Sequence, residues 1–497
     1  MTLRGFPAAR TPPDPRADPG RAMICFSSTP PISPRIGSSP EWGMTPWNPH
    51  SWQRCPAHQQ PTYDDPSELE GILARLRRMP PLVVPEEVDR LRGLLAEAAA
   101  GRRFLLQGGD CAEQFKDCTP EAIEGKLRVL LQMSVALTHG GRKPVVRVGR
   151  IAGQFAKPRS KPTEVVQGRE FPSYRGDLVN GLEATESARR PDPGRMLEAY
   201  FHASATLNHL RALTAGGFAD LHHPERWELP GGRGEVPAYR RTLDQVRESL
   251  DFLEALGGVQ RDVLERIDFF TSHEALLLPF EEALTRWVGE AGAYYNLGAH
   301  TLWVGERTRQ LEGAHLEYLR GIRNPVGVKV GPSATPEHLV ALLDKLDPQR
   351  EPGRITLISR FGAGRIATAL PPLLKAVQAA GHPVLWSCDP MHGNGTESST
   401  GLKTRDFASI LSELRQAFEL HRAQGSHLGG VHIELTGEAV TECTGGTEGL
   451  SETDLLKAYE TGCDPRLNGT QSLEMALLIA ERLRGCPGSP TAPWGAG

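Results

Sequence analysis

The sequence predicts a (β/α)8 barrel of the TIM-barrel type, an α/β fold in which helices cover a closed ring of parallel strands. Three observations support this prediction. Eight short apolar runs recur along the chain, stretches with helical periodicity separate most of them, and ionisable residues stand at the end of each run. Apolar strands that end in charged residues are typical of barrel enzymes, whose active sites lie at the carboxyl ends of the strands. The runs are residues 104–110, 145–151, 268–276, 300–306, 326–332, 355–362, 383–390 and 430–437.

The connections between the runs favour a closed barrel over an open, doubly wound sheet. Residues 337–346 and 370–381 carry apolar residues at three- and four-residue spacing, as on the buried face of a helix. Eight strands joined in this way fit a barrel. The connection over residues 180–255 is too long for one helix, and residues 195–215 and 239–257 are both helical in pattern. We therefore expect a helical insertion between the second and third strands, where regulation or assembly is often located.

The rest of the chain divides into an extension before the barrel and a tail after it. Residues 1–43 are rich in Pro, Ser and Arg without periodicity, which predicts a disordered extension. The preferred interpretation is a start codon assigned too early, with Met44 as the true first residue. A plastid-targeting peptide is less favoured, because the prolines oppose an amphipathic helix. We expect an N-terminal helical extension over 44–100, the catalytic barrel over 101–485 and a flexible tail over 486–497.

The composition excludes several classes of protein. The chain has 497 residues, of which 39% are hydrophobic and 23% charged, and its formal net charge is −4, unlike a polybasic nucleic-acid binder. No apolar run approaches the ~18 residues that span a bilayer, and the N-terminal residues lack the apolar core of a secretory signal. The eight cysteines are scattered, which favours free or metal-binding thiols over a disulfide scaffold. We expect a cytoplasmic protein without nucleic-acid or membrane partners.

One set of strand-end residues is cationic and suits phosphate and carboxylate oxygens. A single strand-end arginine is more often a salt-bridge partner than a ligand contact. Ionisable groups at all eight strand ends are harder to explain in that way, because burying such groups without partners is costly. The cations are Arg150, Lys157, Arg307, Lys329 and Arg360, and further strand-end groups are His273, Glu274, Glu306 and Asp389.

A second set offers sulfur, nitrogen and oxygen donors and consists of Cys111, His392, Glu434 and Asp464. Such donors suit Mn, Co, Fe or Zn, and a single thiolate does not favour Mg. The four residues form no local motif, however, and a small buried residue after a Gly-Gly turn is the better explanation of Cys111 taken alone. The sequence contains no P-loop, no strand–turn–helix dinucleotide site and no G-x-S-x-G elbow.

Sequence blocks from about Trp52 to Leu483 resemble the class II, plant and actinobacterial type of 3-deoxy-D-arabino-heptulosonate 7-phosphate (DAHP) synthase, in its long form. The blocks are LLQGGDCAE, GRIAGQFAKPRS, YRGD, TSHEALLLPFEEALTR, LWVGERTRQLEGAH, NPVGVKVGP, CDPMHGN, GGVHIELTGE and CDPRLN. The resemblance implies a (β/α)8 barrel with an N-terminal extension. It also implies a transferase that condenses phosphoenolpyruvate with D-erythrose 4-phosphate and water to give DAHP and phosphate, the first step of the shikimate pathway to chorismate and the aromatic amino acids.

The resemblance assigns roles position by position. The implied metal ligands are Cys111, His392, Glu434 and Asp464, which reverses the explanation of Cys111 given above. Mn²⁺ or Co²⁺ is the implied metal, and Cd²⁺, Fe²⁺ and Zn²⁺ are further candidates. The implied phosphoenolpyruvate contacts are Arg150, Lys157, Glu306, Arg307, Lys329 and Arg360. Among these, Arg150, Glu306 and Lys329 are the expected catalytic residues, while Ser160 is expected nearer the phosphate of the aldose.

The resemblance further implies aromatic amino-acid effectors and a homo-oligomer, with the insertion at 180–255 contributing to both, and chorismate mutase is a candidate partner.

Two departures from the family pattern bear on substrate detail rather than on the reaction type. Phe361 stands where many members have Met, and the sequence HGNG replaces HGNT. We also expect Cys463 to lie close enough to Cys111 for a reversible disulfide, which would remove a metal ligand on oxidation.

Three alternatives stay open at the level of sequence. The nearest is an amino-DAHP synthase of a secondary-metabolite pathway, which would share every catalytic residue. Another is a Schiff-base aldolase that uses Lys329. The third is a non-catalytic sensor that keeps the barrel and binds aromatic amino acids.

Overall fold

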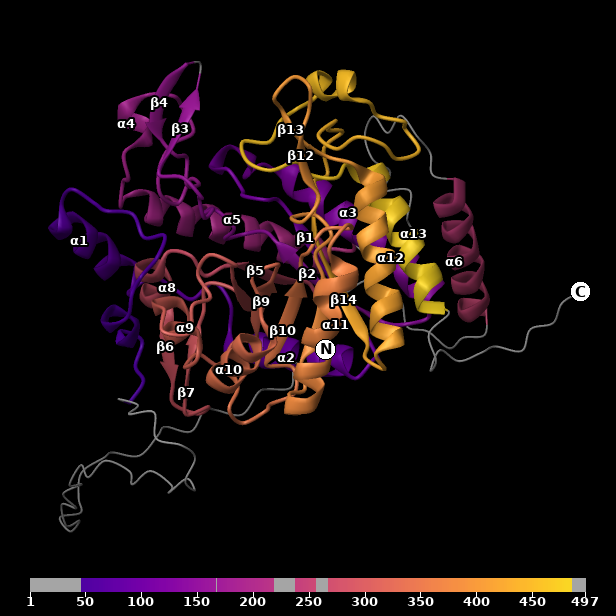
Figure 1. Cartoon of the computed structure of the whole chain (residues 1–497), viewed down its shortest axis with the longest axis horizontal. Coiled ribbons are helices and arrows are strands. Elements are labelled where there is room, and N and C mark those ends of the chain that lie inside the picture. The colour runs from indigo at the N-terminus through magenta and orange to yellow at the C-terminus, as the bar shows by residue number, and fades with distance from the viewer. Residues whose placement is uncertain (1–45, 167, 219–236, 256–266, 485–497) are drawn as a thin grey trace, which may run out of the picture. The chain divides into compact units, whose positions relative to one another are not determined.

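The computed structural model describes residues 46–166, 168–218, 237–255 and 267–484. Within these ranges, eight parallel strands close into a barrel in the order β1-β14-β11-β10-β9-β8-β5-β2. Figure 1 shows helices on the outside of these strands. Seven strands lie inside the predicted apolar runs, and β14 begins two residues before the run at 430–437, so the barrel prediction is confirmed. The strands are β1 (Phe104–Gly109), β2 (Val145–Arg150), β5 (Phe270–Glu274), β8 (Thr301–Val304), β9 (Val326–Val330), β10 (Ile355–Ser359), β11 (Leu385–Cys388) and β14 (Leu428–Glu434).

The register of the barrel brings the ends of three strands together. Gly109, the last residue of β1, pairs with Glu434 of β14 on one side and with Arg150 of β2 on the other. Gly109 has a φ of 146°, and a Cβ atom at this position would lie 2.5 Å from the carbonyl oxygen of Arg150. A glycine is therefore required where the chain leaves β1. The residues that follow it, Asp110 and Cys111, consequently emerge beside the ends of β2 and β14.

Helices cover the outside of the barrel. The long helix α3 (Pro120–Gly141) contacts β1 and β2, and it packs beside α13 (Gly469–Arg484), which also contacts α12 (Phe407–Ala423) (Figure 1). A Cβ atom at Gly140 would lie 2.6 Å from the Cβ atom of Ala480, so glycine permits the close approach of α3 and α13. The helices predicted over 337–346 and 370–381 are present as α10 (Pro336–Leu346) and α11 (Ile366–Ala380).

The N-terminal extension contains α1 (Pro66–Leu76) and α2 (Pro85–Ala99), both predicted as helices. Its second helix, α2, closes the end of the barrel at which the strands begin. Asp65 accepts hydrogen bonds from the backbone N–H groups of Ser67 and Glu68 and so caps α1. Leu91 and Leu95 of α2 belong to one buried cluster with residues near the starts of the strands, namely Leu105, Val146, Phe270 and Leu385. Helix α2 does not cover the opposite end of the barrel, where the strands finish, and a functional site can form there.

The connection between β2 and β5 contains the predicted helical insertion. Its two main helices are α5 (Arg195–Ala215) and α6 (Pro237–Ala255), and a short helix α4 (Glu186–Arg189) precedes them. Part of the expected insertion, residues 219–236, lies outside the described residues, as do residues 1–43 and 486–497. The proposed boundaries of the extension, barrel and tail therefore stay predictions.

Three antiparallel strand pairs were not predicted from the sequence. Their strands have only three or four residues and alternate weakly, so no period-2 pattern marks them. The remaining connections are the short helices α8 (Leu278–Ala283) and α9 (Ala314–Leu319). Among the described helices, none is long and apolar enough to cross a membrane. The three antiparallel strand pairs that were not predicted are β3 (Thr163–Val166) with β4 (Arg169–Pro172), β6 (Thr285–Val288) with β7 (Ala293–Asn296), and β12 (Gly395–Glu397) with β13 (Lys403–Arg405).

Candidate active site

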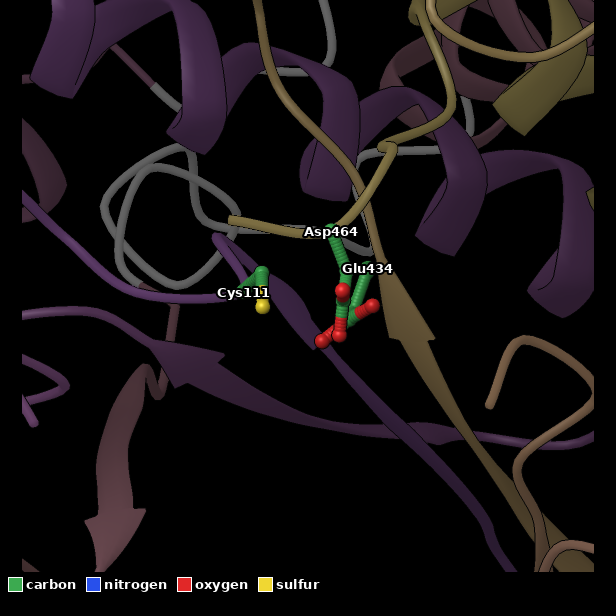
Figure 2. Close-up of side chains that lie close together, drawn as sticks. All are labelled: Cys111, Glu434 and Asp464. Atoms are coloured by element: carbon green, nitrogen blue, oxygen red, sulfur yellow. The ribbon is translucent and has the colours of Figure 1, made fainter. Parts of the chain in front are cut away.

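Three of the four predicted metal ligands converge at the ends of β1 and β14. The sulfur of Cys111 and carboxylate oxygens of Glu434 and Asp464 all lie within 4.8 Å of one another, and Figure 2 shows the three side chains directed to one place. Cys111 follows β1, Glu434 ends β14, and Asp464 lies in the loop before α13. That loop is held against β14, because the N–H of Leu467 donates to the carbonyl oxygen of Glu434 over 3.0 Å.

The fourth predicted ligand, His392, joins this group from the loop after β11. Its Nε2 atom lies 3.1 Å from Oε1 of Glu434, and its Nδ1 atom lies 2.7 Å from Oδ2 of Asp389. A carboxylate on the second nitrogen is the usual way in which a metal-binding imidazole is oriented. One thiol, one imidazole and two carboxylates in this arrangement are a donor set that fits a divalent transition metal.

The electrostatics of the donor set depend on nearby cations. Burial raises the pKa of Glu434, but the charges of His392 and Arg405 outweigh it and hold the pKa well below its ordinary value. The Nη1 atom of Arg405 lies 2.7 Å from Oε2 of Glu434. Asp464 is likewise acidic, because the charge of Lys157 outweighs the effect of burial on its pKa. Both carboxylates are therefore ionised, as metal ligands must be.

The two thiols at this position lie within hydrogen-bonding reach of each other. The hydrogen bond with Cys463, together with burial, raises the pKa of Cys111 well above its ordinary value. The same hydrogen bond lowers the pKa of Cys463 to about 7. Both cysteines are free in the structure, so the disulfide between them stays a prediction.

Lys157 and Arg150, both predicted to contact substrate, pair with the carboxylates of the donor set. The Nζ atom of Lys157 lies 2.6 Å from Oδ2 of Asp464 and donates to the sulfur of Cys111 over 2.9 Å. The Nη2 atom of Arg150 lies 3.2 Å from Oε1 of Glu434, and its Nε atom donates to the carbonyl oxygen of Asp110 over 2.9 Å. Both cations thus border the place where the donor atoms meet.

A buried histidine further fixes the guanidinium of Arg150. The Nη1 atom of Arg150 lies 2.6 Å from Nε2 of His432, whose Nδ1 atom lies 2.9 Å from Oε1 of Gln107. Burial and the charges of Lys329 and Arg150 hold the pKa of His432 well below its ordinary value. His432 is therefore neutral, so its Nε2 atom accepts from the arginine while its Nδ1 atom donates to the glutamine.

The remaining predicted cations line the ends of β9, β10 and β8. Lys329 is paired with Asp389, the same carboxylate that holds His392. Burial lowers the pKa of Lys329 to about 8, although Asp389 opposes the shift. The Nη2 atom of Arg360 donates to the carbonyl oxygen of His392 over 3.0 Å. Arg307 is exposed, and its Nη2 atom donates to Oγ of Ser160 over 2.6 Å.

Glu306, expected to be catalytic, is engaged in an ion pair. Its Oε1 atom lies 2.9 Å from Nη2 of Arg309 and accepts a hydrogen bond from Ser333. Burial raises the pKa of Glu306, but the contact with Arg309 outweighs it, so the net shift is downward. A Cβ atom at Gly331 would lie 2.8 Å from Oε2 of Glu306 and 3.0 Å from Nη1 of Arg360, which places both side chains around that glycine.

Sequence reasoning assigned no role to Glu274 at the end of β5. Its Oε1 atom is buried without a hydrogen-bond partner among the described residues. Burial raises the pKa of Glu274, and the charges of Lys329 and Arg150 oppose that shift. Its position at a strand end was the only signal in the sequence. Arg405, in the hairpin formed by β12 and β13, gave no such signal, because it lies on no barrel strand.

Comparison with known proteins places this site in a family. A model of the Class-II DAHP synthetase family matches residues 47–480. The chain is 48% identical over 458 residues to the phospho-2-dehydro-3-deoxyheptonate aldolase of Neurospora crassa, an alignment covering 88% of this chain and 94% of the relative. The enzyme of that name from Streptomyces coelicolor is 47% identical, with coverage of 88% and 97%. The phospho-2-dehydro-3-deoxyheptonate aldolase AroG of Mycolicibacterium smegmatis is 49% identical, with coverage of 86% and 93%.

Proposed function

Since the chain belongs to the class-II DAHP synthetase family, we propose that it condenses phosphoenolpyruvate with erythrose 4-phosphate and water, releasing DAHP and phosphate in a metal-dependent reaction. The observation that carries the proposal is the meeting of two chemical sets at one end of the barrel. Cys111, Glu434 and Asp464 bring donor atoms within 4.8 Å of one another. Cations for two anionic substrates, including Lys157 and Lys329, stand around them.

The metal would be held by Cys111, His392, Glu434 and Asp464. When bound, it supplies Lewis acidity toward the aldehyde oxygen of erythrose 4-phosphate. Mn²⁺ or Co²⁺ is our proposed native metal, since imidazole and carboxylate donors with one thiolate suit these ions. Asp389 orients His392 for this role from its second nitrogen, over 2.7 Å.

The cationic side chains would hold the two substrates in the reacting geometry. C3 of phosphoenolpyruvate forms a bond to the aldehyde carbon, water adds at C2, and the C2–O bond to phosphate then breaks. Holding two reactants in this orientation can lower the barrier by several kcal/mol, up to ~7–11 kcal/mol. In this proposal Arg307, Lys329 and Arg360 contact phosphoenolpyruvate, and Ser160, which accepts a hydrogen bond from Arg307, lies nearer the phosphate of the aldose.

Proton transfer near neutral pH is suited to two groups in the site. Lys329, with its pKa lowered to about 8, can exchange a proton in the physiological range. Glu274 has a raised pKa and a buried, unpartnered oxygen, which suits a carboxyl that handles the proton of the added water. Arg150 already has protein partners on all three guanidinium nitrogens, so we propose that it orients the site as well as contacting substrate.

A phosphate-release assay tests the proposal. Phosphate should appear only when phosphoenolpyruvate and erythrose 4-phosphate are both present, EDTA should abolish its release, and Mn²⁺ or Co²⁺ should restore it. Release that resists EDTA, together with borohydride trapping of substrate on Lys329, would instead support the Schiff-base aldolase. An aminosugar analogue of erythrose 4-phosphate, used in parallel, distinguishes the amino-DAHP reaction. Metal binding without any phosphate release would support the sensor.

Feedback by aromatic amino acids and assembly into a homo-oligomer complete the proposal. A cavity of about 160 Å³ between α2, α5 and β5 combines charged and apolar lining, including Arg90, Asp268, Leu207 and Phe269. An aromatic amino acid needs both kinds of contact. Calorimetric titration with phenylalanine, tyrosine and tryptophan, repeated on Leu207→Glu, tests this placement, and binding that survives the substitution would contradict it. Light scattering, with and without a chorismate mutase, tests the oligomer and that partner.

A further inference from the structure

Arg466 occupies a buried position between the loops that carry the donor atoms. It lies two residues after Asp464, and only 7% of its surface is exposed. Its Nη1 atom lies 2.7 Å from Oδ1 of Asp110. On its other edge, Nη2 and Nε donate to the two carboxylate oxygens of Glu442 over 2.8 and 3.1 Å. The guanidinium therefore bridges two carboxylates, one of them in the bidentate geometry that arginine favours.

Each of these carboxylates belongs to a loop that carries a donor of the site. Asp110 directly precedes Cys111, and its carbonyl oxygen accepts from Nε of Arg150 over 2.9 Å. Glu442 lies in the loop that leaves β14 after Glu434, and its side chain also accepts the backbone N–H of Arg466 over 2.7 Å. Arg466 itself continues the loop of Asp464. One side chain thus connects the three segments that supply sulfur and carboxylate donors.

The two carboxylates that Arg466 contacts most closely are buried and paired with cations. Asp110 and Glu442 are 1% and 0% exposed, and the second oxygen of Asp110 is paired with Lys126 of α3. Arg466 and Lys126 thus pair with these two carboxylates, and Glu438 lies at a longer distance of 3.7 Å from Nη2 of Arg466. Breaking one such pair leaves an uncompensated buried charge, so the loss of Arg466 should disturb the loops that its partners belong to.

We propose that Arg466 is a positioning residue that sets the spacing between Cys111 and Asp464 and so prearranges the donor set for a divalent cation. This inference rests on the metal-dependent function proposed above. Arg466 acts through Asp110 and Glu442, because each of its three guanidinium nitrogens is bonded to one of these carboxylates. Groups that orient metal ligands in this indirect way typically change metal affinity by about 10–100-fold when they are altered.

The test is the affinity of the metal-free full-length protein for Mn²⁺, measured by calorimetry or by electron paramagnetic resonance of free Mn²⁺. Arg466→Lys keeps the charge but replaces three donor nitrogens with one, so it cannot hold both carboxylates. We expect its Kd for Mn²⁺ to rise about 10–100-fold. At saturating Mn²⁺, kcat should recover toward the wild-type value, while the KM for phosphoenolpyruvate should change little.

A second buried arginine supplies the matched control. Arg354 is 6% exposed, precedes β10 at the opposite end of the barrel, and donates to the carbonyl oxygens of Leu319 and Asn324. Arg354→Lys should lower the melting temperature but leave the Kd for Mn²⁺ unchanged. A purely structural role of Arg466 would make the two variants alike, and that result would overturn the inference.

Two further variants keep the test decisive if Arg466→Lys does not fold. Asp110→Asn and Glu442→Gln each keep the shape of one partner and remove its charge, so either should weaken Mn²⁺ binding in the same direction. A folded variant with wild-type affinity for Mn²⁺ at each of these positions would overturn the inference. Failure of the wild-type protein to bind Mn²⁺ would instead refute the proposed metal dependence, so the two failures are distinguishable.

Discussion

The two sides of the barrel mouth are held in place by opposite charges. The acidic side consists of Cys111, Glu434 and Asp464 at the ends of β1 and β14. Cations such as Lys157 and Arg405 surround it, and Arg466 supports it through an ion pair with Asp110, the residue before Cys111. The basic side consists of Lys329 and Arg360 at the ends of β9 and β10. Lys329 is paired with the carboxylate of Asp389, and Arg360 donates to the carbonyl oxygen of His392. Converging groups of like charge repel one another. Asp389 offsets this repulsion on the basic side, and Lys157 offsets it on the acidic side.

On the basic side, Glu413 of α12 supports the backbone that follows Arg360. Its Oε1 atom accepts from the backbone N–H groups of Phe361 and Gly362 over 2.8 and 2.9 Å, directly after Arg360. Its Oε2 atom accepts from Nδ2 of Asn394 over 2.7 Å, two residues after His392. These donors are neutral, whereas Arg466 on the acidic side pairs with charged groups. The acidic side should therefore be the more sensitive to the loss of a single partner.

The largest expected effect comes from removing a donor of the acidic side. Cys111→Ala should abolish metal-dependent DAHP formation, because the sulfur donor is lost while the neighbouring carboxylates remain. Bound Mn²⁺, measured by elemental analysis after dialysis, should fall with it. Cys118→Ala is the matched control, since its half-buried thiol contacts the carbonyl oxygen of His202 away from the site. Near-wild-type turnover and metal content in Cys111→Ala would remove Cys111 from the ligand set.

A smaller effect, mainly on catalysis, is expected on the basic side. Lys329→Met preserves the length of the side chain but removes its charge and its proton, so kcat should fall about 10²–10⁴-fold. The Kd for Mn²⁺ should rise far less than in Cys111→Ala, because Lys329 contacts no donor atom and reaches the ligand His392 only through Asp389. Lys345→Met on α10 controls for the loss of a lysine elsewhere. Loss of Mn²⁺ affinity equal to that of Cys111→Ala would show that the two sides are not separable.

The barrel could be predicted because its strands are short apolar runs with clear boundaries, as in 326–332 and 355–362. The site could be predicted in outline for a geometric reason. In a closed parallel barrel all strand ends meet at one face, so Cys111, Glu434 and Lys329 had to converge once the strands were correct. The resemblance of the sequence blocks then divided these residues into ligands and substrate contacts.

The supporting side chains Glu413, Arg405 and Arg466 could not be predicted, because none of them lies at the end of a barrel strand. Glu413 is in the middle of a helix, and no pattern in the sequence tells which loop its carboxylate meets. Arg405 lies in a hairpin of three-residue strands that carries no periodicity. Arg466 follows Asp464 by two residues, but its partners Asp110 and Glu442 come from loops that only the tertiary fold brings together. Contacts of this kind depend on packing rather than on local sequence.

The smallest expected effect is a change in the pH dependence of stability caused by Glu413. Burial raises the pKa of Glu413 to about 7 from an ordinary value of 4.5, although hydrogen bonds from Phe361 and Gly362 oppose the shift. Between these values the folded protein keeps a proton that the unfolded chain releases. This group therefore favours the folded state at low pH, and its contribution falls as the pH rises through the window, by about 3 kcal/mol in total.

Glu413→Gln removes the titration while keeping an oxygen for the two backbone N–H groups. The difference in the free energy of unfolding between pH 5 and pH 8, measured by urea denaturation, should be smaller in this variant than in the wild type. Glu419→Gln, an exposed position on the same helix, should leave the wild-type difference unchanged. Equal pH dependence in all three proteins would show that Glu413 does not carry the raised pKa. Glu413 would then be charged at both pH 5 and pH 8. The two sides would differ only in the geometry of the contacts that their supporting side chains make.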